Sequence, residues 1–66
     1  MFFIETESLK ELQAYANKSK TLDDLTGNAL QWLYIIIDML SNEDDTTYTE
    51  NSAKVIDFIE NYEQLA

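Results

Sequence analysis

The chain of 66 residues contains no cysteine, no histidine and no proline, and its four basic residues are all lysines. Without cysteine no disulfide can form, and without cysteine and histidine the usual structural zinc sites are excluded. Histidine, cysteine and arginine supply many of the bases, nucleophiles and anion-binding groups of enzymes. The single glycine, Gly27, also excludes a glycine-rich phosphate loop. We therefore expect a protein that is not an enzyme and that holds no metal or cofactor.

Long apolar segments and targeting signals are missing too. The start, Met-Phe-Phe-Ile-Glu, has no basic residue and only a brief apolar run, unlike a signal peptide. The longest apolar stretch, residues 29–40, is shorter than the roughly 20 residues that cross a bilayer, and Gln31 and Asp38 interrupt it. These features predict a cytoplasmic protein without a membrane segment.

Positive charge is scarce. Thirteen acidic residues against four lysines give a formal net charge of −9. Such a field repels nucleic acid and anionic membranes, so neither is expected as a direct partner. The charge favours a basic partner protein, although it equally serves to keep a small apolar protein in solution.

What the chain does have is a dense apolar run from Ala29 to Leu40. At 100° per residue, only Gln31 and Asp38 share a clearly polar direction, and the apolar residues cover more than half of the circumference. A surface helix usually has an apolar stripe little wider than about 100°. This helix is therefore expected to be covered on several sides. Asp38 fits an exposed edge or a polar interface contact better than a catalytic role.

The first helix is predicted from Thr6 or Ser8 to about residues 17–19. Ser8 and Glu11 have the spacing of a capping box, in which the two side chains satisfy backbone N–H groups at the helix start. Lys18 and Lys20 follow at the C-terminal end, where cations are favourable. The apolar residues before this helix, Phe2, Phe3 and Ile4, are expected to pack on the bundle or on a partner.

The second helix is predicted to start after Thr21, a favourable N-cap residue. Apolar residues then recur at intervals of three and four, so one helix from Leu22 to about Ser41 is the simplest interpretation. Two alternatives stay open at Gly27 and Asn28: a bend that separates a first turn from a helix beginning at Ala29, or the close approach of another backbone to Gly27.

The third helix is predicted after the acidic segment 41–47. Thr47 and Glu50 have capping-box spacing, and an apolar face runs from Tyr48 to Leu65. Glu50 and Lys54 would form an i, i+4 ion pair on this helix. The expected fold is an all-α, single-domain three-helix bundle over residues 1–66: a long helical hairpin plus a first helix shorter than the other two. A strand over 32–37 is disfavoured because no second strand could pair with it.

The acidic segment does not match a calcium loop. Counted from Asn42, the sixth and twelfth positions of an EF-hand loop fall on Thr47 and Ala53, where glycine and glutamate are required. We therefore expect a solvated loop with Asp44 or Asp45 close to the start of the next helix.

The first hypothesis of function is a non-enzymatic interaction module that forms a homodimer through the second helix. Chains this short bury only about 60% of their unfolded surface, so association is a common source of stability. The expected contact residues are Trp32, Ile35 and Met39, although Trp32 also suits the core. Tyr34 is expected at the rim. The flank with Ile35 should be less covered within a monomer than the flank with Leu33, Ile37 and Leu40.

The alternative hypothesis is an acidic inhibitor that imitates DNA. Acidic residues on neighbouring helical turns lie about 5–6 Å apart, and a surface of this kind could occupy a basic nucleic-acid-binding groove on another protein. A virus or mobile element that inhibits a host enzyme would suit such a protein. The acidic face would comprise Glu43, Asp44, Asp45, Glu50, Asp57, Glu60 and Glu63.

Overall fold

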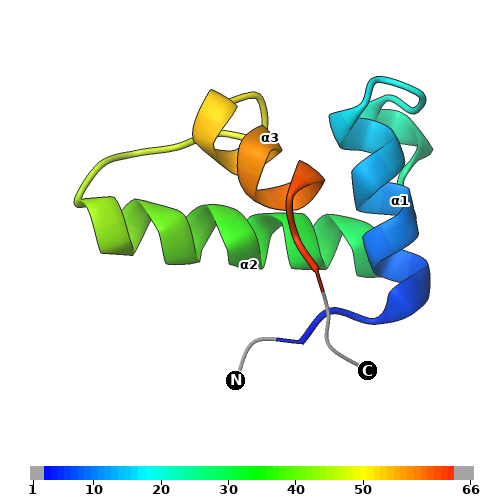
Figure 1. The fold of residues 1–66 in the computed structure, drawn as a ribbon, viewed down its shortest axis with the longest axis horizontal. Helices are drawn as coiled ribbons and strands as arrows, with labels where there is room; N and C mark the ends of the chain where they lie inside the picture. The colour runs from blue at the N-terminus through cyan, green and yellow to red at the C-terminus, as the bar shows by residue number, and fades with distance from the viewer. Residues whose placement is uncertain (1–2, 64–66) are drawn as a thin grey trace.

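The computed structural model describes residues 3–63, which form an all-α bundle of three helices, as predicted (Figure 1). The elements in chain order are α1 (Thr6–Ala16), the short 3-10 turn η1 (Leu22–Asp24), α2 (Gly27–Asp44) and α3 (Ala53–Glu60). Each pair of the three helices packs together, and α2 is the longest of them. Within residues 3–63 no helix is long and apolar enough to span a membrane.

Helix α1 begins at Thr6, two residues before the predicted capping box. Ser8 therefore lies inside the helix, where it is almost fully buried. Glu11 reaches forward along the chain: its carboxylate accepts hydrogen bonds from the backbone N–H and the hydroxyl of Thr26, at 3.0 and 2.8 Å. The predicted box of Ser8 and Glu11 is therefore wrong, because a contact with the start of α2 takes the Glu11 side chain.

A break before Gly27 separates η1 from α2. Asp24 accepts a hydrogen bond from the Thr21 N–H at 3.1 Å, so a capped turn does begin where the sequence predicted a helix. Leu25 then turns to an extended conformation, and Thr26 caps α2 by accepting from the Ala29 N–H at 3.4 Å. One continuous helix from Leu22 is thus wrong. The alternative of a short first turn is closer, with the break two residues earlier than expected.

Gly27 itself has no close neighbour. A Cβ atom built at this position would meet nothing within 4 Å, so the predicted close approach of another backbone is wrong. As the first residue of α2, Gly27 lies where the helix penalty of glycine is smaller than in a helix interior.

Helix α2 runs three residues beyond the predicted end and stops at Asp44. Asp45 takes the left-handed conformation, with φ 51° and ψ 47°, and its N–H bonds back to the Ser41 carbonyl. The Thr46 N–H donates to the same carbonyl at 3.0 Å. This arrangement satisfies the last carbonyls of the helix, as left-handed C-terminal caps usually do.

Helix α3 begins at Ala53, six residues after the predicted cap at Thr47, and is the shortest helix. Side chains hold residues 48–52 in a different conformation. The Tyr48 N–H donates to the Ser41 hydroxyl at 3.1 Å, and the Thr49 N–H donates to the Ser52 hydroxyl at 2.8 Å. Such local bonds compete with helix formation. The prediction that the first helix is the shortest is therefore wrong, as is the prediction that Glu50 belongs to α3.

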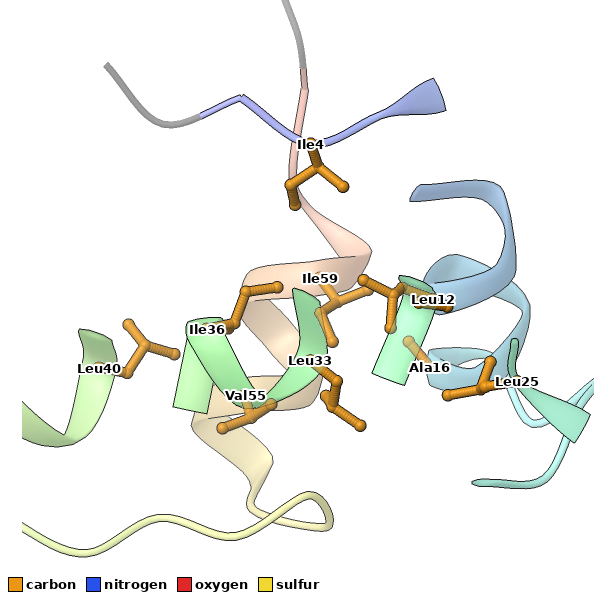
Figure 2. Close-up of a cluster of buried hydrophobic side chains, with 10 residues drawn as sticks. Ile4, Leu12, Ala16, Leu25, Leu33, Ile36, Leu40, Val55 and Ile59 are labelled. Atoms are coloured by element: carbon orange, nitrogen blue, oxygen red, sulfur yellow. The ribbon is translucent and has the colours of Figure 1, made fainter. Parts of the chain in front are cut away.

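The core lies where the three helices meet the N-terminal segment (Figure 2). Ile4 is fully buried, which confirms part of the expectation for the first residues, whereas Phe3 is 56% exposed; Phe2 lies outside the described residues. The other fully or almost fully buried apolar residues come from all three helices and the segment around η1: Leu12, Ala16, Leu25, Ala29, Leu33, Ile36, Leu40, Val55 and Ile59.

Candidate interaction surfaces

The outer face of α2 carries two exposed apolar side chains. Leu33, Ile36 and Leu40 turn into the core at the three-and-four spacing of a helix. The residues between them consequently turn outward, leaving Tyr34 53% exposed and Ile35 40% exposed. The prediction that the Ile35 flank is less covered than the Leu33 flank is confirmed.

A surface hollow of about 510 Å³ lies beside these two residues. Its lining comes from α2 alone: Gln31, Tyr34, Ile35, Asp38 and Met39. The Asp38 carboxylate accepts a long hydrogen bond of 3.4 Å from the Asn42 side-chain amide, one turn further along α2. The hollow thus combines an apolar floor with an amide, a phenol and a carboxylate, groups that orient a bound molecule by hydrogen bonding.

The three residues predicted for self-association do not lie equally on this face. Ile35 and Met39 line the hollow, whereas Trp32 is half-buried and packs against the core. Tyr34, predicted only as a rim contact, is the most exposed apolar side chain of α2. The helical period places it about 40° beyond Asp38, on the far side of the polar edge from Ile35. The exposure of Tyr34 could therefore be predicted from the sequence, but its place in the lining of the hollow could not.

The predicted acidic face is spread over three parts of the chain. Glu43, Asp44 and the C-cap residue Asp45 lie at the end of α2, and Glu50 lies in the connection before α3. The remaining residues belong to α3 or follow it: Asp57, Glu60 and Glu63. Glu50 is half-buried, and its backbone carbonyl accepts a hydrogen bond of 2.8 Å from the Tyr15 hydroxyl. The other six side chains are exposed, so the acidic character is general rather than confined to one helix face.

Asp44 has internal partners. Its carboxylate accepts a hydrogen bond of 2.6 Å from the Tyr48 hydroxyl, which holds the pKa of Asp44 below its usual range. The Lys54 ammonium lies 3.6 Å from the same carboxylate, in place of the ion pair predicted between Lys54 and Glu50. Asp44 therefore lies close to the start of α3, as we expected for Asp44 or Asp45. Its contacts with Tyr48 and Lys54 join the end of α2 to the connection and to α3.

A second hollow, of about 450 Å³, lies between the end of α1 and the residues before α3. It is lined by Tyr15, Ala16, Lys18, Lys20, Thr21, Asn51 and Ile56. The Tyr15 hydroxyl donates to the Glu50 carbonyl and contacts the Asn51 side chain, and burial raises the pKa of Tyr15. Lys20 is already paired with Glu11, at 3.8 Å. The polar groups of this hollow therefore hold two parts of the chain together.

No group of three or more acidic, cysteine or histidine side chains in the described part of the chain is arranged to hold a metal ion. Comparisons with protein-family models, with curated proteins and with solved structures gave no match.

Proposed function

We propose that this protein is a non-enzymatic interaction module that self-associates through the outer face of α2. The observation that carries the proposal is the pair of exposed side chains Tyr34 and Ile35 in the middle of the longest helix, beside an apolar hollow. Tyrosine and methionine are enriched at protein contact sites, and Tyr34 and Met39 both line this hollow with Ile35.

The small size of the bundle supports this proposal. Burial of apolar surface stabilises a protein by about 25 cal/mol per Å², so apolar area left on α2 is a source of free energy that a partner can use. Two-fold homodimers are the commonest closed assemblies, and they let one face serve both partners. Asp38 is the single charged residue in the lining, so the hollow itself does not select a basic partner.

The proposal is tested by introducing a charge at the centre of the face. Ile35→Asp places a carboxylate where the partner would bury it, and an unpaired buried charge is strongly unfavourable. A matched control, Thr47→Asp, adds the same charge at an exposed position outside the three helices. Analytical ultracentrifugation over a range of concentrations measures assembly, and circular dichroism measures helix content.

We expect the wild type and Thr47→Asp to form dimers of twice the 7.7 kDa chain mass, and Ile35→Asp to stay a helical monomer. A wild type that remains monomeric at high concentration would contradict the proposal. So would a folded Ile35→Asp protein that dimerises as well as the control. Loss of helix content in Ile35→Asp would instead assign Ile35 to the core, against its exposure.

A further inference from the structure

We propose that two copies of the chain pair their α2 helices antiparallel, about a two-fold axis beside Ile35. In this arrangement Gln31 of each copy contacts Asp38 of the other, and Trp32 contacts Met39 of the other. The inference rests on the proposed function and adds the orientation and register of the pair.

Ile35 lies at the middle of α2, which runs from Gly27 to Asp44. With a rise of about 1.5 Å per residue, nearly equal lengths of helix, about 12–14 Å, extend on either side of it. A two-fold axis at this point therefore lets the whole of one α2 lie along the other. An axis near either end would leave half of each helix without a partner.

The residues around Ile35 form two flanks of different chemistry. At 100° per residue, Gln31 and Asp38 lie about 40° and 60° to one side of Ile35, and Met39 and Trp32 lie about 40° and 60° to the other. Along the axis, Gln31 precedes Ile35 by about 6 Å and Asp38 follows it by about 4.5 Å. Trp32 and Met39 have the same two spacings in reverse.

In an antiparallel two-fold pair, the flank with Gln31 and Asp38 faces the same flank of the other copy, and the order of the residues along the helix axis is reversed. Gln31 of one copy then lies within about 1.5 Å, along the axis, of Asp38 of the other copy, and Trp32 lies equally close to Met39. The Gln31 amide can donate to the Asp38 carboxylate, which has acceptor capacity beyond the long bond from Asn42. A tryptophan ring beside a methionine sulfur is also a favourable contact.

A parallel pair brings unlike flanks together at the same height. Asp38 would then lie against the Met39 thioether, which cannot donate a hydrogen bond, and the two Asp38 residues would lie level with each other. A carboxylate that loses water without gaining a donor is unfavourable. Hydrogen-bond complementarity between Gln31 and Asp38, and the cost of placing Asp38 against Met39, therefore favour a second copy in the antiparallel orientation.

Cysteine cross-linking tests the orientation, and a chain without native cysteine makes it specific. Disulfides need Cα atoms within about 4.4–6.8 Å. We would prepare Gln31→Cys and Asp38→Cys at two exposed positions, check helix content, and oxidise each protein alone and both as a mixture. Ile35→Cys, at the axis, is the positive control. Mass spectrometry identifies which chains are joined.

We expect Ile35→Cys to form a disulfide dimer. The mixture of Gln31→Cys and Asp38→Cys should form about tenfold more disulfide than either protein alone. The reason is that the two Gln31 residues of an antiparallel pair lie about 12 Å apart along the axis, too far for a disulfide. Efficient self-linking of Gln31→Cys would overturn the antiparallel orientation and leave the proposed dimer intact. A dimer that depends on Ile35 but gives no mixed disulfide would overturn the register. A monomeric wild type would instead defeat the proposed function.

Discussion

Ile36→Ala tests whether the buried side of α2 is the core of the bundle. Ile36 is fully buried between α2 and α3. The change removes three carbon atoms, worth about 0.8 kcal/mol each in lost burial, and leaves a cavity, so the total loss is about 2–5 kcal/mol. A chain of this length has only about 3–10 kcal/mol of folding free energy. We therefore expect Ile36→Ala to be largely unfolded or to unfold at much lower urea concentration.

The matched control is the neighbouring residue. Ile35→Ala removes the same atoms at a position that is 40% exposed, so its loss should be under about 1 kcal/mol in the monomer. The free energy of unfolding of both variants is measured by urea titration, with the fluorescence of the single tryptophan as the signal. The protein concentration is kept low enough to exclude dimers, because association raises apparent stability. Equal losses at the two positions, or a loss below 1 kcal/mol for Ile36→Ala, would refute the assignment of the core.

Two further predictions concern charged groups. The backbone N–H and hydroxyl of Thr26, and then the charge of Lys20, hold the pKa of Glu11 below its usual range. The folded state therefore favours the carboxylate, so its contribution to stability is present at neutral pH and is lost as the pH falls through the lowered pKa. Glu11→Gln should accordingly be less stable than the wild type in urea at neutral pH, with the difference disappearing in acid; a constant difference would contradict this linkage. Separately, Asp57→Lys with Glu60→Lys changes two exposed residues and should alter the free energy of unfolding by under about 1 kcal/mol. If the acidic-inhibitor hypothesis is right, that variant should recover less of a basic partner protein in affinity purification than the wild type does. Added salt should also weaken binding by the wild type. A recovery that changes with neither the substitutions nor the salt concentration would contradict the hypothesis.

The sequence predicted the helical class and the inner side of α2, because both depend on a period of 3.6 residues that runs through long segments. It failed at helix ends. The spacing of Thr47 and Glu50 matches a capping box, but Ser41 and Ser52 bind the intervening backbone instead. Glu11 likewise contacts Thr26, fifteen residues away. The Glu11 contact joins segments that are distant in sequence, which single-sequence patterns do not record. The Ser41 and Ser52 bonds are local alternatives to a helix, and capping-box spacing alone does not distinguish between the two.

The late start of α3 limits how much of the length of α2 the bundle covers. Had α3 begun near Thr47, it would have been long enough to follow most of α2. Its eight residues span only about 12 Å, whereas the eighteen residues of α2 span about 27 Å. Val55 and Ile59 cover the inner side of α2 near Ile36, as Figure 2 shows, and α1 contributes Leu12 to the same cluster. Neither short helix encircles α2, so its outer side, with Tyr34 and Ile35, is left uncovered. A longer α3 would cover more of the inner side only, so the outer face, on which we propose that a second copy packs, is uncovered because the other two helices both lie on the inner side of α2.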